Sequence, residues 1–168
     1  MHRWQFLGLA VLATTACSAV PARPTAGTAV IHGGVTGLAL ESPTALSIAR
    51  HTPGAATLQL KLAVTNLTCT LTEAADHVTF DLGAFAAGTY TLSKGYPALA
   101  SVGPTGARGH ACPATPTGGA APPCHDAVLS GTLVITKIGG LEDPVEGTFD
   151  LQLVDGAVSG SFSAYRCD

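Results

Sequence analysis

The chain has few cations, almost no tryptophan and no long apolar run beyond its first residues. Lys and Arg together number 8 against 11 Asp and Glu, and they form no basic cluster, so the electrostatic surface that nucleic-acid binding needs is missing. The only Trp is Trp4 and the only Met is Met1. The composition therefore argues against a nucleic-acid partner and against a sugar-binding platform built on Trp.

The first 16 residues predict an export signal. Arg3 supplies a positive start, an apolar run extends from Phe6 to Ala13, and small residues follow it. The run is shorter than the ~20 residues that a transmembrane helix needs. We therefore expect residues 1–16 to be a signal peptide and the rest of the chain to be exported.

The end of this signal, Thr14-Thr15-Ala16-Cys17, resembles the lipobox of bacterial lipoproteins, with Thr14 in the place where Leu is usual. The resemblance implies that Cys17 carries lipid and that the membrane is a partner through this anchor. Ser18 stands where inner-membrane retention usually requires Asp, so we expect the outer membrane. The alternative is cleavage after Ala19 or Ala22, which would leave a secreted protein with an odd cysteine.

About 150 residues remain after the signal, which is enough for one domain and too few for two. The residues up to about Thr28 are small and proline-spaced, without the apolar periodicity that folding needs. We therefore expect residues 17–29 to form a flexible tether and residues 30–168 to form a single domain.

Alternation of apolar with polar or small residues dominates this domain. Leu58, Leu60, Leu62 and Val64 lie on one face of an expected strand, and Lys61 lies on the other face, which should meet solvent. Other short strands are expected at Val35 to Leu40, Ala45 to Arg50, Val78 to Leu82 and Thr89 to Leu92.

The C-terminal third predicts a three-stranded antiparallel meander. Its segments are Thr132 to Lys137, Val145 to Leu153 and the run that follows the turn Asp155-Gly156. An Asp-Gly pair between alternating runs is a strong hairpin signal. Phe149 and Phe162 should both face the core.

No window carries a helical stripe of adequate length outside the signal. The expected fold class is therefore all-β: an antiparallel β-sandwich or partly open barrel of about eight strands. The stretch from Gly103 to Cys124 is rich in Gly, Pro, Ala and Thr, and we expect it to be a long loop.

Once Cys17 is set aside, four cysteines remain, an even number as two disulfides require. Cys112 and Cys124 lie at either end of the most flexible part of the expected loop, and Cys69 and Cys167 are left over. Of the three connectivities that four cysteines permit, we expect Cys112 with Cys124 and Cys69 with Cys167.

Titratable residues flank the first of these pairs. His110, Cys112, Cys124, His125 and Asp126 lie close together in the sequence, and with reduced thiols they would be suitable zinc ligands. The oxidising export compartment favours disulfides instead, so we expect no cofactor. The alternative function is an exported metal-binding protein or metal-dependent hydrolase that uses His110, His125 and Asp126.

Other catalytic motifs are absent, and we do not expect an enzyme. No Gly-x-Ser-x-Gly elbow occurs, and Ser159, Ser161 and Ser163 are expected on the outer face of a strand. The acidic residues Glu142 and Glu146 flank Pro144 in what should be a solvated turn, without the ligand loop of an EF-hand.

Four segments carry a wider resemblance: Ser130 to Thr136, Val145 to Asp150, Val158 to Ala164 with Cys167 close behind, and Ala87 to Tyr90. They resemble segments of uncharacterised lipoproteins of myxobacteria and similar GC-rich bacteria. The resemblance implies an exported, anchored β-domain and implies no activity. Our leading hypothesis is a non-enzymatic cell-envelope lipoprotein with a binding or structural role. A further alternative is a module that binds an envelope protein or peptide along an exposed sheet edge.

Overall fold

The computed structural model describes residues 26–51, 57–65, 67–69, 76–93, 107–112, 128–140 and 143–167. This part of the chain is all-β, as expected, with nine strands rather than about eight. The strands are β1 (Gly27–Val35), β2 (Ser42–His51), β3 (Leu58–Ala63), β4 (His77–Leu82), β5 (Gly88–Ser93), β6 (Ala107–Cys112), β7 (Val128–Ile138), β8 (Val145–Leu153) and β9 (Gly156–Cys167). Among the described residues there is no helix that is long and apolar enough to cross a membrane.

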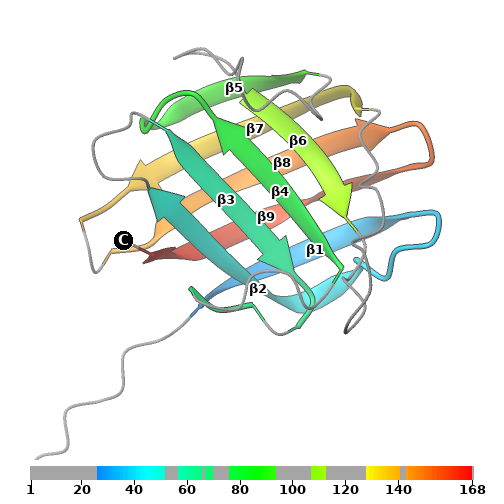
Figure 1. The fold of residues 1–168 in the computed structure, drawn as a ribbon, viewed down its shortest axis with the longest axis horizontal. Helices are drawn as coiled ribbons and strands as arrows, with labels where there is room; N and C mark the ends of the chain where they lie inside the picture. Colours follow the sequence, from blue (N-terminus) through cyan, green and yellow to red (C-terminus); the bar gives the residue numbers. More distant parts are fainter. Residues whose placement is uncertain are drawn as a thin grey trace, which may run out of the picture.

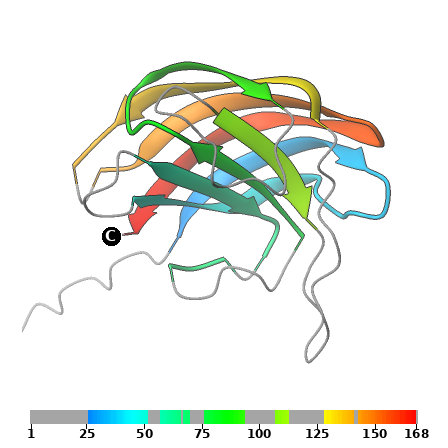
Figure 2. The same ribbon diagram turned by 45° about the horizontal axis from the view of Figure 1, so that its top comes forward.

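The strands form a flattened barrel. Each pairs with the next in the order β1-β2-β3-β4-β6-β5-β7-β8-β9, and β9 pairs back to β1. Only two residue pairs, Leu92 with Ala107 and Ser93 with Arg108, join β5 to β6, so the sheet is barely connected at this seam. Figures 1 and 2 show β3, β4 and β6 in one layer, crossing the layer of β7, β8, β9 and β1. The structure thus lies within the expected class of sandwich or partly open barrel.

The C-terminal meander is confirmed. β7 pairs with β8 and β8 with β9, all antiparallel, and Phe149 and Phe162 are 4% and 5% exposed. The turn differs from the prediction by one residue. Leu153 pairs with Gly156, so the two-residue turn is Val154-Asp155, and Gly156 is the first residue of β9.

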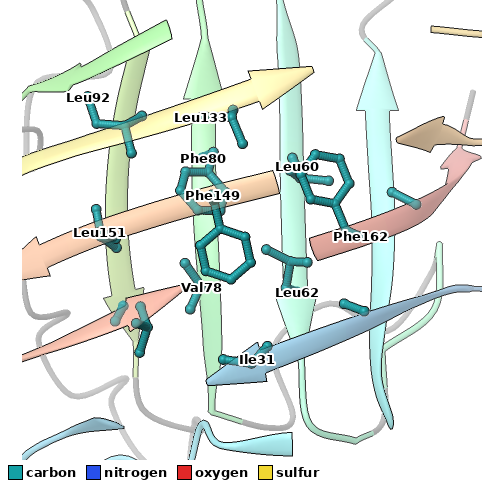
Figure 3. Packing of buried hydrophobic residues seen from close by; sticks show 14 of the residues in the cluster. Ile31, Leu60, Leu62, Val78, Phe80, Leu92, Leu133, Phe149, Leu151 and Phe162 are labelled. Atoms are coloured by element: carbon teal, nitrogen blue, oxygen red, sulfur yellow. The ribbon is translucent and has the colours of Figure 1, made fainter. Parts of the chain in front are cut away.

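Phenylalanine rings and glycines alternate across β8 and β9 in the core. Phe149 is opposite Gly160, and Phe162 is opposite Gly147. A Cβ on Gly147 would lie 2.7 Å from Cζ of Phe162, and one on Gly160 would lie 3.0 Å from Cε1 of Phe149. Each ring therefore covers the glycine on the neighbouring strand, an arrangement that stabilises glycine within a sheet. The Phe149 ring also packs against that of Phe80, with 5.3 Å between centroids (Figure 3).

The first strand is misplaced in the prediction. β1 begins at Gly27, inside the range 17–29 expected for the tether, and Ala29 is already buried. The segment expected as a strand from Val35 to Leu40 is largely a turn, in which the N–H of Leu38 donates to the carbonyl of Val35. Glycines interrupt the apolar alternation of β1, so its extended state depends on pairing with β9 along most of its length.

The loop expected from Gly103 to Cys124 contains β6, which pairs with β4 from His77 to Leu82. Its sequence, Ala-Arg-Gly-His-Ala-Cys, has weak strand propensity. Gly109 lies where a Cβ would come within 2.8 Å of the Leu151 side chain. The strand state of this segment therefore depends on pairing with β4 and on a position without a side chain at Gly109, neither of which local sequence propensity reveals.

Lys61 also differs from the prediction. The sequence places it on a solvent face of β3, whereas it is 7% exposed. Ala63 on the same face of β3 belongs to a second small apolar cluster with Ile48, Leu67 and Cys167. Cys167 comes from the far end of the chain, and the disulfide between Cys69 and Cys167 holds the Leu67 segment beside it, so alternation within β3 could not reveal this burial.

Candidate functional site

A groove with a volume of about 520 Å³ crosses the outer face of the barrel over β1, β2, β7, β8 and β9. We call it the hydroxyl groove, because six of its lining residues carry a hydroxyl group. These six are Thr28, Thr44, Thr136, Thr148, Ser161 and Ser163. Val30, Pro43, Leu46 and Glu146 also line it.

Strand register arranges these residues in two rows that run across the strands. In the first row Leu46, Thr28, Ser163 and Glu146 are successive partners on β2, β1, β9 and β8. In the second row, two residues further along β1, β9 and β8, Val30, Ser161 and Thr148 are partners. Period-two alternation places all of these on the face opposite to the core.

The groove lies beside a fork in the sheet. β2 pairs with β1 over its first half and with β9, in parallel, over Ile48 to Arg50. The buried Ser47 hydroxyl lies in the fork, 2.7 Å from the carbonyl oxygen of Thr28 and 3.2 Å from that of Ser163. Gly27 enters between β2 and β9, where a Cβ would clash with the backbone of β9. The start of β1 is therefore held from both sides, which gives the groove a rigid floor.

The charge of the groove is small. Glu146 is the only titratable residue among the described lining residues, and its carboxylate lies 3.9 Å from Nζ of Lys137. Both side chains are more than 40% exposed, so this ion pair adds little stability. Thr136 donates its hydroxyl hydrogen to the Glu146 carbonyl.

The remaining hydroxyl groups of the groove make no hydrogen bond within the described part of the chain. They belong to Thr28, Thr44, Thr148, Ser161 and Ser163. The first four of these residues are exposed, and Ser163 is half-buried. Each hydroxyl can donate one hydrogen bond and accept two. The groove thus offers an array of unused donors and acceptors on a fixed backbone.

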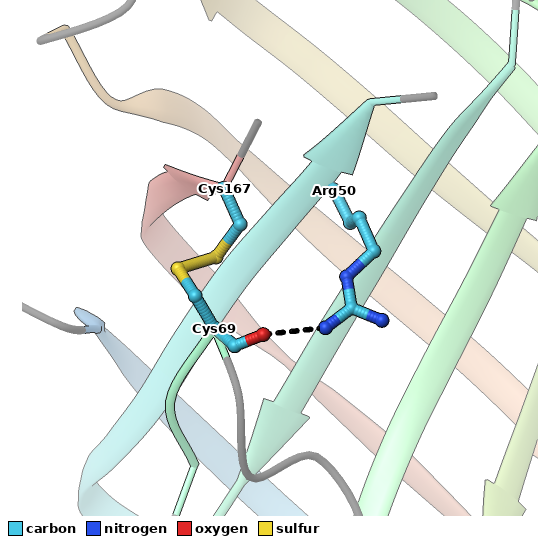
Figure 4. The surroundings of a disulfide bond; sticks show 3 residues. All are labelled: Arg50, Cys69 and Cys167. Atoms are coloured by element: carbon cyan, nitrogen blue, oxygen red, sulfur yellow. Dashed lines mark hydrogen bonds between the residues drawn. A yellow bond between two sulfur atoms is a disulfide. The ribbon is translucent and has the colours of Figure 1, made fainter. Parts of the chain in front are cut away.

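The expected disulfide between Cys69 and Cys167 is present, with their Cα atoms 5.5 Å apart. Arg50 donates from Nη2 to the Cys69 carbonyl at 2.6 Å (Figure 4). Together these two links hold the segment Leu67 to Cys69 against the outside of the barrel, where Leu67 is buried. The disulfide therefore has a structural role: it joins this segment to the end of β9, the last strand in the chain.

The other expected cysteine sites are only partly described. Cys112 is buried and disulfide-bonded, whereas its expected partner Cys124 lies outside the described residues. Cys17, the expected lipid attachment site, also lies outside them, as does the expected signal peptide.

Of the three residues of the metal alternative, His110 alone lies within the described part of the chain. The backbone of His110 lies in β6, opposite Thr79 of β4, and His125 and Asp126 lie outside the described residues. Within the described ranges no three His, Cys, Asp or Glu residues are grouped as a metal site.

Two features were missed by the sequence interpretation. The first is the groove itself, although the regular Ser and Thr positions of β8 and β9 carried a signal that we assigned to plain strand surface. The second is a group of buried polar residues, Lys61, His77 and Thr79, on the outer side of β3 and β4. Among the described residues, the Thr79 hydroxyl is buried without a hydrogen-bond partner.

Comparison with protein-family models, with curated proteins and with solved structures finds no match for the chain.

Proposed function

We propose that the chain is an exported, lipid-anchored protein of the cell envelope whose β-barrel is a non-enzymatic binding module, and that the hydroxyl groove is its binding surface. The single observation that carries the proposal is the group of hydroxyls, in a concave site of about 520 Å³, that make no hydrogen bond within the described chain. Sites for small or extended ligands are typically concave and largely preformed, with a few polar groups that fix orientation.

The rigidity of the floor supports a binding role. β1, β8 and β9 have sheet neighbours on both sides, so the backbone under the groove is ordered before any ligand arrives. Serine and threonine side chains have few rotamers to lose on binding. A preformed site of this kind reduces the entropic cost of association.

The lining supports a non-enzymatic role. General acid–base catalysis needs titratable groups within hydrogen-bond reach of the reacting atoms. The described lining offers Glu146 alone, which faces Lys137 in an exposed ion pair. No second carboxylate or histidine accompanies it among these lining residues.

The start of the barrel agrees with an anchored domain. Nine residues, Ser18 to Ala26, separate Cys17 from the first strand, and the ten steps from Cys17 to Gly27 span at most about 36 Å. Thr28, the second residue of β1, lines the groove. A lipid on Cys17 would therefore keep the groove within a short distance of the membrane surface.

The test compares two threonines on the same outer sheet. Thr148 of β8 lines the groove, whereas Thr132 of the adjacent strand β7 is also exposed and lies outside its lining. Immobilised full-length protein is incubated with solubilised envelope, and the components that it retains are identified. Thr148→Arg should abolish retention of the component that the wild type binds, and Thr132→Arg should leave its retention unchanged. Retention that survives in both variants, or none by the wild type, would contradict the proposal.

A further inference from the structure

The arrangement of groups in the groove restricts the chemistry of the ligand. Adjacent strands in a sheet are about 4.8 Å apart, and residues two positions apart on one strand are separated by about 6.8 Å. Ser163 and Thr28 are neighbours along the first row, and Thr148 and Ser161 along the second. A chain laid across β8, β9 and β1 along the first row would therefore meet a polar side chain at each step of about 4.8 Å, namely Glu146, Ser163 and Thr28. Along the second row the polar side chains are on β8 and β9, and Val30 is the residue on β1.

Hydroxyl groups select a ligand that both donates and accepts hydrogen bonds. A serine or threonine hydroxyl does both, and its hydrogen rotates to suit the partner. A polyhydroxylated chain presents the same kind of group at each repeat, and each of its hydroxyls can pair reciprocally. A carboxylate such as Glu146 is a further acceptor for ligand hydroxyls, and such charge-assisted bonds are stronger than neutral ones.

Other ligand classes fit less well. A peptide that adds to a sheet needs a free strand edge, whereas β1, β8 and β9 are paired on both sides beneath the groove. An anionic ligand needs a cationic cluster, and the site has one acid beside one lysine. An acyl chain would cover the hydroxyls without replacing their hydrogen bonds to water, which is unfavourable.

The apolar side chains of the groove complete the argument. Val30 and Leu46 are half-buried and lie in separate rows, where they can contact the C–H faces of sugar rings without aromatic stacking. Resting on the proposed binding role, we infer that the hydroxyl groove binds an extended, neutral polysaccharide laid across β8, β9 and β1. Without a stacking ring the binding is weak for each sugar and depends on several sugars bound in succession.

The test uses two insoluble neutral polysaccharides, β-1,4-glucan and chitin, with cellohexaose and N-acetylchitohexaose as soluble competitors. Detergent-solubilised full chain is co-sedimented with each polysaccharide, and the bound fraction is measured. The wild type should bind at least one polysaccharide and be released by the matching hexaose.

Matched variants locate the interaction. Thr148→Val keeps the size and strand preference of the side chain but removes its hydroxyl, and should weaken binding several-fold. Thr148→Arg should weaken it at least ten-fold by filling the groove. Thr132→Arg, the same change outside the groove, should bind as the wild type does. The unfolding temperature of each variant separates a lost contact from a lost fold.

Three results would overturn the inference: no binding to either polysaccharide, equal binding by Thr148→Arg and Thr132→Arg, or a retained envelope component that protease treatment destroys. The first and third leave the proposed function standing if retention from envelope extracts still depends on Thr148. Loss of that dependence would instead refute the proposed function itself.

Discussion

Replacement of Phe149 by alanine tests the packing of the barrel most directly. The ring is 4% exposed, lies 5.3 Å from the ring of Phe80 and covers Gly160 on the next strand. Truncation would leave a cavity between the two layers and remove the cover from the glycine. Ser161 lies on the neighbouring strand β9 and faces away from the core, and it is the matched control because its side chain is exposed.

The size of the effect follows from burial. Truncation of a buried phenylalanine to alanine typically costs about 3 to 5 kcal/mol, and a tilted aromatic pair accounts for about 0.5 to 1.5 kcal/mol beyond its buried area. A domain of this size has only ~5 to 15 kcal/mol of stability in total. Since each kcal/mol shifts the melting temperature of such a domain by about 3 °C, Phe149→Ala should lower it by about 10 to 15 °C.

Thermal and urea unfolding, followed by circular dichroism, measure the loss. Ser161→Ala should change the unfolding free energy by less than about 0.5 kcal/mol. If the two substitutions had equal, small effects, the assignment of faces in β8 and β9 would be refuted. A register slip of one residue exchanges the two faces of a strand completely, so the groove assignment would be lost at the same time.

Three further predictions concern cysteines. Cys17→Ser should block lipid modification and move the protein out of membrane fractions, as measured by fractionation and intact mass; wild-type protein without acyl mass would contradict this. Peptide mapping without reduction should recover Cys69 joined to Cys167 and Cys112 joined to Cys124, whereas free thiols with stoichiometric zinc would support the metal alternative. Because the bond between Cys69 and Cys167 spans 98 residues, the double variant with alanine at both positions should lose about 4.7 kcal/mol of unfolding free energy in the chain-entropy model.

Sequence alone predicts the parts of this fold that depend on local alternation. β8 and β9 are identified because one face is buried and the other is exposed, so apolar residues recur at every second position. β6 is missed because its strand state depends on β4 beside it and on the narrow space around Gly109. The burial of Lys61 is missed because Leu67, which helps to cover that side of β3, belongs to a segment held there by the disulfide at Cys69.

The sequence likewise predicts only part of the candidate site. The outward positions of Ser161 and Ser163 follow from period-two alternation, and the structure confirms them. Their proximity to Thr28 and Leu46 depends on which strands become neighbours, and β1 and β9 are more than 100 residues apart in the chain. The groove is thus a property of strand order and sheet curvature, which no local pattern in the sequence specifies.

The fork at the start of β1 has a mechanical consequence under the proposed anchor at Cys17. A pull from the membrane would reach the barrel at Gly27, between β2 and β9. Along the strand axis it would load the hydrogen bonds on both sides of β1 in shear, so that several must break together rather than one after another. The barrel therefore resists force well at this attachment point, and the strands beneath the groove beside it would keep their arrangement under such a pull.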